Sequence, residues 1–253
     1  MLKRHQYNGS FDQMAKCNYN NAPLLYTLRW VWILAVMLSV ELPSVAQRAD
    51  MGFFNRIRLH TDINIRCKAS NDSIGWISYD GLGCGNDAVV AVVNNDVMTI
   101  YHKEVAKEEL PDTVYVFFPQ LVSVANAYNA TLAIDSLCTE NKFKAELQGN
   151  GQITIGNLHA KEAELTVLTG NGIITVKQGN CNKIKARIVG TGQINMSGLI
   201  SDETMLRCFG TGSIDCPQTQ NIKIRGLGTT KIYYTGNPKI KRKGNARIIK
   251  VDD

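Results

Sequence analysis

One short motif recurs at nearly constant spacing through the second half of this 253-residue chain. It reads Gly, then Asn or Thr, then Gly, then any residue, then Ile. Four clear copies and two degraded ones begin at Gly149, Gly170, Gly190, Gly210, Gly228 and Gly244, at spacings of 21, 20, 20, 18 and 16 residues. A degenerate copy begins at Asn129. So short a unit buries its apolar face only against neighbouring copies, so the repeat predicts a stacked architecture.

Each motif leads into an alternating segment. Ile stands four residues after the leading Gly in all six copies, and Ile155, Val176, Met196 and Cys216 stand two residues further on in the clear ones. This period of 2 predicts a strand with one buried face. A second alternating segment precedes the Gly. In the second copy, Leu165 and Val167 stand one residue out of phase, so we expect a one-residue bulge there.

The Gly-x-Gly sequence predicts a sharp corner between these two strands, because Gly reaches positive φ without steric cost. The middle Asn and Thr side chains would then stack and hydrogen-bond from copy to copy. A second turn is expected after each motif, at Gly156, Gly179, Gly198, Pro217 and Gly236. Each repeat is therefore expected to be a strand, a corner, a strand and a second turn.

Together these patterns predict an all-β chain whose residues 119–253 form a parallel β-solenoid, right-handed and β-helix-like, with rungs of about 20 residues. An antiparallel meander or sandwich is the alternative, because Asn-Gly is also a hairpin signal. Residues 47–118 are rich in strand patterns but lack the motif. We expect this region to cap one end of the solenoid.

Residues 1–46 have the features of a signal peptide. Residues 30–40 form an uncharged apolar run of 11 residues after Arg29, and Ser44-Val45-Ala46 offers small residues for cleavage before Gln47. Such a run is shorter than the roughly 20 residues that span a bilayer. We therefore expect export to the periplasm, the outer-membrane surface or the medium. An uncleaved anchor or a buried helix is the alternative.

Cysteines and histidines offer little for a metal or cofactor. Six cysteines follow the signal segment: Cys67, Cys84, Cys138, Cys181, Cys208 and Cys216. An even number in an exported chain permits disulfides, and the sequence leaves their pairing open. Cys208 and Cys216 fall in the inward columns and suit small core residues. With no C-x-x-C and four His, we expect neither a metal site nor a cofactor.

Charge and acid placement argue against two further functional classes. The net charge of +6 is too dispersed to indicate nucleic-acid binding. A polysaccharide-cleaving β-helix needs clustered carboxylates, or Asp with Lys or Arg, on one exposed face. The acids of the repeats, which we expect at different phases, are Glu146, Glu162, Glu164, Asp202, Glu203 and Asp215. His60, His102 and His159 have no Ser or Cys motif beside them. We therefore predict no catalytic residues.

Several segments together resemble a known bacterial family. They are Phe54-Asn55-Arg56-Ile57, residues 119–124, the repeated Gly-x-Gly motif, and residues 232–238 at its end. The combination resembles the family described as putative auto-transporter adhesin, head GIN domain. The resemblance implies a secreted or surface-associated protein of Gram-negative bacteria, with a β-helix-like fold and no catalytic residues.

We therefore expect an exported, non-enzymatic structural or adhesive protein. Its partner would be an unidentified surface glycan or protein, and a homo-oligomer is left open. A carbohydrate-binding module that stacks sugars on Trp76 or on the Tyr233-Tyr234 pair is the main alternative. A polysaccharide-cleaving enzyme is the less favoured one.

Overall fold

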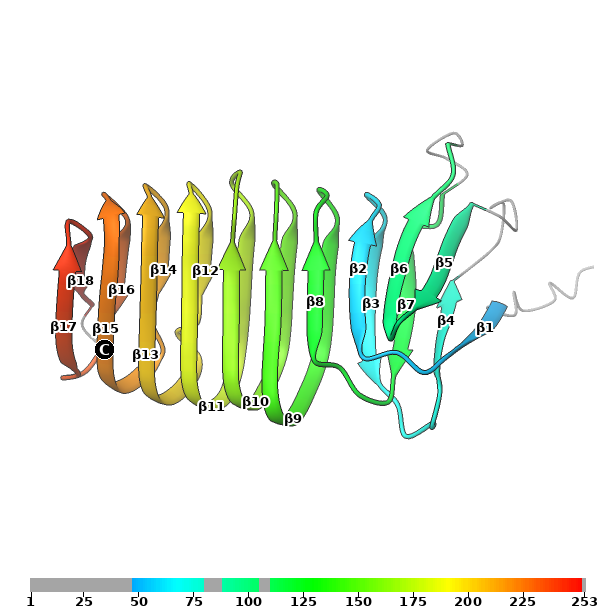
Figure 1. Cartoon of the computed structure of the whole chain (residues 1–253), viewed down its shortest axis with the longest axis horizontal. Helices are drawn as coiled ribbons and strands as arrows, with labels where there is room; N and C mark the ends of the chain where they lie inside the picture. Colours follow the sequence, from blue (N-terminus) through cyan, green and yellow to red (C-terminus); the bar gives the residue numbers. More distant parts are fainter. Residues whose placement is uncertain (1–46, 80–87, 105–109, 252–253) are drawn as a thin grey trace, which may run out of the picture. The chain divides into compact units, whose positions relative to one another are not determined.

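The computed structural model describes residues 47–79, 88–104 and 110–251, which form eighteen strands and no helix (Figure 1). The expected signal peptide and Cys84 lie outside the described residues. Within those residues, no helix has the length and apolar character to cross a membrane.

The strands fall into two groups along the chain. The N-terminal group is β1 (Gln47–Gly52), β2 (Arg56–His60), β3 (Asn64–Ala69), β4 (Gly75–Tyr79), β5 (Val89–Asn94), β6 (Val97–His102), β7 (Thr113–Phe118) and β8 (Ser123–Asn126). The repeats form β9 (Thr131–Leu147), β10 (Gln152–Val167), β11 (Ile173–Gly190), β12 (Gln193–Asn195), β13 (Leu199–Gly210), β14 (Ser213–Asp215), β15 (Gln218–Gly228), β16 (Lys231–Tyr234), β17 (Lys239–Gly244) and β18 (Arg247–Lys250).

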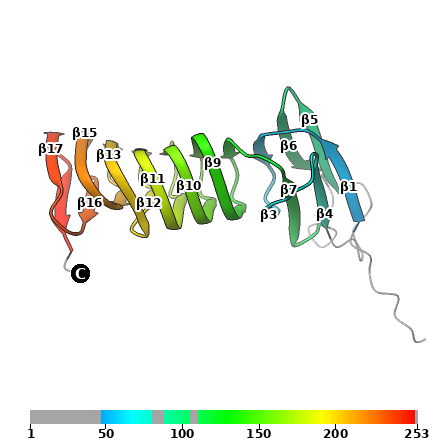
Figure 2. The same cartoon turned by 90° about the horizontal axis from the view of Figure 1, so that it is seen from below.

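Successive repeats pair in parallel, with equivalent residues side by side. The motif isoleucines form one continuous column, in which Ile153, Ile174, Ile194, Ile214 and Ile232 are each 0% exposed. The predicted parallel β-solenoid is therefore confirmed, with about six turns. Figure 2 shows β9, β10, β11, β13, β15 and β17 following one another along the stack. The antiparallel meander is excluded for these strands.

Each long strand bends where the in-out alternation slips. In β10 the alternation slips at Gly156 and Asn157 and again at Lys161 and Glu162, where two consecutive residues lie outside the core. The second turn expected at Gly156 is thus a bend within a continuous strand, and the bend at Lys161 was not predicted. The bends divide a rung into three short faces around the core.

The extra residue of the second repeat lies in a different place from the one we expected. Val167 pairs directly with Leu147 and with Ile188, so the strand itself carries no bulge at this point. The additional residue lies in the corner between Val167 and Ile173. A register shift does occur one rung earlier, where β10 pairs with β9 near Ala160.

The last repeat is also aligned differently from the expected one. Gly244 pairs with Gly226, and not with the leading glycine Gly228. Arg247 nevertheless pairs with Lys231. The final corner is therefore shorter than the others, which explains the shortened spacing of the last copy.

The Gly-x-Gly corner needs glycine for two separate reasons. Gly190 has a φ of 121°, a conformation that side-chain-bearing residues rarely adopt. At Gly212 a Cβ would lie 2.1 Å from the carbonyl oxygen of Gly192 in the preceding rung. At the position of Gly212, the rungs can therefore stack only because no side chain is present.

The polar ladder expected along the corner is present. The backbone N–H of Asn171 donates to Asn150 Oδ1 at 3.0 Å, and Thr191 Oγ1 donates to Asn171 Oδ1 at 2.5 Å. These bonds join three successive rungs through the middle residue of the motif.

The N-terminal strands extend the stack and then close it. The β2–β3 pair lies between β8–β9 on one side and β6–β7 on the other, all in parallel. The order of rungs therefore departs from the order of the sequence. Antiparallel strands follow, with β4 pairing with β7 and β1, and β5 pairing with β6. They form the predicted capping region.

The opposite end of the stack is closed by charge. Arg242 continues the column of Leu206 and Ile224, but it is exposed. A charged side chain at an inward position of the last rung discourages another rung from stacking there.

Candidate functional site

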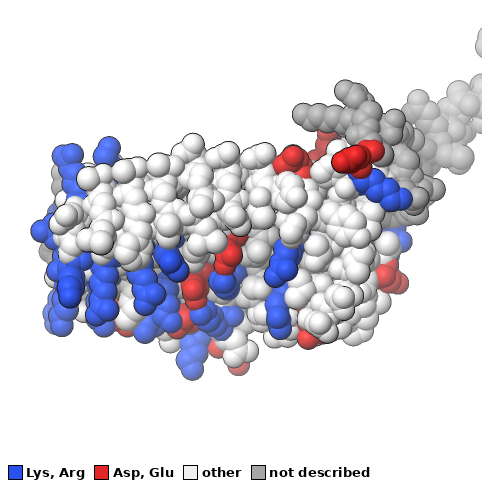
Figure 3. All heavy atoms as spheres, turned by 45° about the horizontal axis from the view of Figure 1, so that its top comes forward, with Lys and Arg blue, Asp and Glu red and all other residues white. Residues whose placement is uncertain are grey.

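Four cations stand in one outward column on successive C-terminal rungs. Arg187 pairs with Arg207, Arg207 with Arg225, and Arg225 with Lys243. We call these four residues the basic ladder. Parallel strands lie about 4.8 Å apart, so the ladder repeats positive charge at about that interval. Figure 3 shows Lys and Arg side chains gathered in rows over these rungs.

The strand pleat fixes the direction of the ladder. The residues on either side of Arg207, Leu206 and Cys208, are each 1% exposed and face the core. Alternation along the strand therefore directs the Arg207 side chain into solvent. Arg187 and Arg225 pair with Arg207 on the neighbouring strands, so their side chains also point into solvent. All four ladder side chains are exposed.

A second basic column runs beside the ladder, two residues earlier on each strand. It contains Lys185, Met205, Lys223 and Lys241. Both columns face the same side of the sheet, because side chains two residues apart on a strand share a face. The C-terminal rungs therefore present a broad basic surface.

Glu203 is the one carboxylate in residues 183–189, 203–209, 221–227 and 239–244. Its neighbours are the ammonium groups of Lys183, at 3.5 Å, and Lys223. The hydrogen bond from Lys223 holds the pKa of Glu203 below its usual range. Within the described part of the chain, no ladder residue forms an ion pair. The ladder therefore keeps its charge available for a partner.

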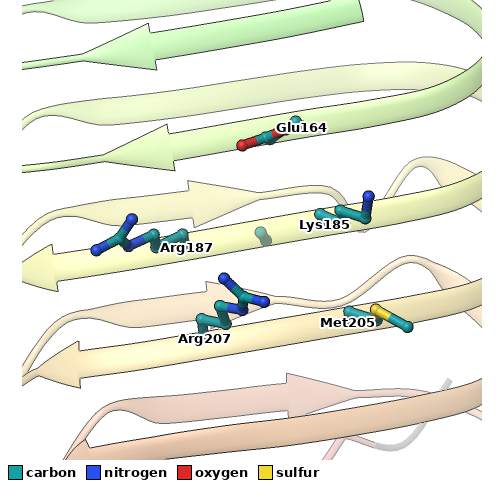
Figure 4. Close-up of a pocket in the computed structure, with 6 residues that line it drawn as sticks. Glu164, Lys185, Arg187, Met205 and Arg207 are labelled. Carbon is teal, nitrogen blue, oxygen red and sulfur yellow. The ribbon is translucent and has the colours of Figure 1, made fainter. Parts of the chain in front are cut away.

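A shallow hollow lies at the start of the ladder, with a volume of about 240 Å³. Figure 4 shows Glu164 on β10, Lys185 and Arg187 on β11, and Met205 and Arg207 on β13 around it. Enclosed ligand pockets usually span about 300–1,000 Å³. The arrangement therefore suits contact with one anionic group of an extended partner rather than capture of a whole small molecule.

The glutamates Glu146, Glu162, Glu164 and Glu203 of the repeats are paired with lysines. Glu162 and Glu203 share one outward column, in which Lys183 lies between them. This corrects the expectation that all six acids fall at different phases. Lys185 Nζ donates to Glu162 Oε1 at 2.7 Å, which is the main cause that lowers the pKa of Glu162. A general acid needs a raised pKa, so this environment opposes that role.

The aromatic residues considered for sugar stacking are largely occupied. The Trp76 ring stacks on Phe117 with centroids 3.6 Å apart, Arg48 lies over it at 4.5 Å, and its Nε1 donates to Asp72 at 2.9 Å. Tyr234 packs against the core, and Tyr233 is half-buried. Trp76 and Tyr234 are therefore engaged within the protein, and Tyr233 alone lines an open hollow at the surface.

The histidines of the described chain lie in separate environments. His60 contacts Tyr128, His102 Nδ1 lies 2.9 Å from Thr61 Oγ1, and His159 contacts Asn180. No group of three or more His, Cys, Asp or Glu side chains is placed to hold a metal ion within the described ranges.

The five cysteines that the structure describes are unpaired. Cys67, Cys181, Cys208 and Cys216 are buried, and Cys138 is exposed. Burial raises the pKa of Cys181 and of Cys208 to about 11. These thiols therefore stay protonated near neutral pH, which suits the core role expected for Cys208 and Cys216.

The basic ladder was not predicted, although the sequence carries a signal for it. Arg187, Arg207 and Arg225 each stand three residues before the leading glycine of their copy. Lys243 cannot be found by this rule, because the last corner is shortened. The ladder becomes apparent when the sequence copies are aligned with one another, but not from the net charge of the whole chain.

Comparison with known proteins places the chain in a family. Residues 53–238 match the family described as "Putative auto-transporter adhesin, head GIN domain". The chain belongs to this family. The resemblance noted in the sequence is thereby confirmed, and so is an adhesin-like β-repeat protein. No protein of curated function matches the chain.

Three solved structures of this type share the fold. A putative adhesin from Bacteroides fragilis has a TM-score of 0.68 at 19% identity, over 82% of this chain and 96% of that chain. A putative lipid binding protein from Parabacteroides distasonis has a TM-score of 0.63 at 16% identity, over 82% and 96%. A putative adhesin from the same species has a TM-score of 0.61 at 20% identity, again over 82% and 96%. At these identities the likeness concerns the fold alone.

Proposed function

We propose that this head GIN domain protein is an exported, non-enzymatic adhesive module that attaches to an anionic surface through the basic ladder. The observation that carries the proposal is the register of Arg187, Arg207, Arg225 and Lys243 on four adjacent rungs, all exposed. A flexible loop could not hold four cations at fixed spacing, whereas hydrogen-bonded rungs fix the backbone positions of all four before binding.

Electrostatics favour an anionic partner. Charges of one sign on a surface raise the local concentration of the opposite sign and speed association. Because the ladder lies in solvent, the attraction is screened by salt over about 8–10 Å at ordinary ionic strength. Binding through the ladder should therefore be strongly salt-dependent.

The absence of catalysis is the second part of the proposal. Glu162, Glu164 and Glu203 are each paired with lysines. The hollow beside the ladder is shallow and open to the surface. Ion pairs of this kind stabilise ionised carboxylates, so they support a structural role for these acids rather than acid-base chemistry.

Export is the third part. It is supported by the apolar run of residues 30–40, by the small residues before Gln47 and by membership of a family described as adhesins. An adhesive surface has a use only where it can meet a partner outside the cell.

The binding proposal is tested with a sulfated polysaccharide. The purified protein is passed over immobilised heparin and over a neutral dextran column at the same ionic strength. We expect retention on heparin alone, and reduced retention of the double variant Arg207→Ala/Arg225→Ala. The matched control is Arg56→Ala/Arg58→Ala, which removes the same charge from exposed positions of β2 on the same side of the stack, where Ala125, Glu146 and Thr166 lie between Arg58 and the ladder. Equal losses in both variants would mean that net charge, and not the ladder, drives binding.

A further inference from the structure

An exposed apolar column runs alongside the basic ladder. Val189 pairs with Phe209, and Phe209 pairs with Leu227, on three successive rungs. Phe209 is 43% exposed and Leu227 is 71% exposed, while Val189 is half-buried. Single exposed apolar residues are ordinary on protein surfaces, but three in register form a contiguous stripe. We call these three residues the apolar column.

The apolar column and the basic ladder face the same way. Phe209 follows Arg207 by two residues, and Leu227 follows Arg225 by two, so each pair shares one side of its strand. Two residues of a strand span about 6.6 Å, so a stripe of cations and a stripe of apolar groups lie about that far apart. On these three rungs the surface is therefore amphipathic across its width.

No carboxylate lies in the corner residues next to the apolar column. The next outward residues along the corner are Thr191, Thr211 and Thr229, all exposed and uncharged. Glu203 lies on the opposite side of the ladder, toward the beginning of its strand. Figure 3 shows a band without charged side chains beside the basic rows. This edge can approach a partner without desolvating an acid.

This pattern complements the surface of an anionic bilayer. Acidic phosphate headgroups attract Lys and Arg side chains that lie near the membrane surface. Apolar and aromatic side chains gain free energy at the boundary between headgroups and acyl chains. A soluble polyanion would use the ladder but would leave Leu227 and Phe209 in water.

We propose that the anionic surface recognised by the ladder is a lipid bilayer rich in acidic phospholipid, with the apolar column entering its headgroup boundary. The inference rests on the proposed function, because it names the partner of the same ladder. The solenoid would then lie with this edge against the membrane, held by charge and by Phe209 and Leu227 together.

Vesicle co-sedimentation tests the inference. The purified protein is mixed with phosphatidylcholine vesicles that contain, or lack, phosphatidylglycerol. We expect binding to the acidic vesicles only. The variant Phe209→Ser/Leu227→Ser should weaken vesicle binding by about tenfold or more, because the stripe no longer enters the boundary. Its retention on heparin should stay unchanged.

A matched apolar control separates this effect from general surface polarity. Val92 and Ile200 are 44% and 58% exposed and lie on β5 and on another part of β13. The variant Val92→Ser/Ile200→Ser should bind vesicles as the unchanged protein does. Urea unfolding of each variant verifies that the solenoid is intact.

The outcomes distinguish this inference from the proposed function. Retention on heparin without binding to acidic vesicles overturns the lipid inference and leaves the ladder's role in place. Vesicle binding that is indifferent to Phe209→Ser/Leu227→Ser also overturns it. Failure to bind either heparin or vesicles contradicts both.

Discussion

At the scale of single residues, the motif predicted the direction of side chains along the strand after each corner. Ile194 lies between Ile174 and Ile214 and is 0% exposed. Gln193 is half-buried on the other side, where its Nε2 donates to Asp215 Oδ2 at 3.1 Å. The inward position follows from period 2 alone. The contact with Asp215 could not be foreseen, because it depends on which rungs meet.

Truncation of the core column is the first prediction. Ile194→Ala should lower the free energy of unfolding by about 2–5 kcal/mol, because it leaves a cavity between stacked rungs. Gln193→Ala should cost no more than about 1.5 kcal/mol, the usual worth of one hydrogen bond. Urea denaturation of both variants measures the difference. Equal destabilisation would mean that the assignment of inward and outward positions is wrong.

Thiol reactivity is the second prediction. Iodoacetamide added to the native protein near pH 8 should modify Cys138 and leave Cys67, Cys181, Cys208 and Cys216 unmodified. Those four thiols are buried, and burial raises their pKa. Iodoacetamide therefore cannot reach them, and little of the reactive thiolate forms. Mass spectrometry of peptides, with and without urea, locates the label. Native labelling of Cys208 at the rate of Cys138 would contradict the packing described.

At the scale of elements, the sequence predicted the strands of the repeat but not all of their bends. The bend at Lys161 has neither Gly nor Pro at or beside it, so no turn-forming residue marks it. It shows only as two successive outward residues. The position of β2 and β3 inside the stack was likewise invisible, because parallel pairing between distant segments leaves no local pattern. Predicting the basic ladder would have required both the repeat and the register in which its copies pair.

Ion pairs that join rungs give the third prediction. Glu162 on β10 pairs with Lys142 on β9 and Lys185 on β11, at 3.5 and 2.7 Å. Because its pKa is lowered in the folded state, it stabilises the fold above its unfolded pKa of about 4.3. This stability is lost as the pH falls through the folded pKa. The contribution should be below about 1 kcal/mol, because the pair is near the surface.

Glu162→Gln should therefore be less stable than the unchanged protein at pH 6, with the gap closing as the pH falls toward 3. Urea unfolding at several pH values measures the gap. Glu140→Gln is the control, since Glu140 is exposed on β9 and makes no ion pair within the described chain. A gap that widened at low pH would contradict the assigned sign.

At the scale of the whole molecule, the fold is a stack with two different ends. Antiparallel strands close one end and a charged rung closes the other, so the parallel array is held to a fixed length. The basic ladder belongs to the charged end. The capped end holds Trp76, packed between Arg48 and Phe117. The capped end and the charged end of the stack therefore differ both in the arrangement of their strands and in their surface charge.

Export gives the fourth prediction. The mature protein should begin near Gln47, because small residues precede that position and an apolar run precedes them. N-terminal sequencing of protein recovered from cell fractions measures this. Recovery of the intact N-terminus in the cytosol would rule out cleavage and export together.

The role of the basic ladder as the binding surface is tested most directly by the salt dependence of its affinity for heparin. Affinity is measured by titration at several salt concentrations for the unchanged protein, for Arg207→Ala/Arg225→Ala and for Arg56→Ala/Arg58→Ala. Each contact between a cation and a polyanion adds to the slope of log affinity against log salt, because bound counterions are released. We predict a shallower slope for Arg207→Ala/Arg225→Ala and the unchanged slope for Arg56→Ala/Arg58→Ala. The same slope in all three proteins would contradict the ladder as the site of attachment.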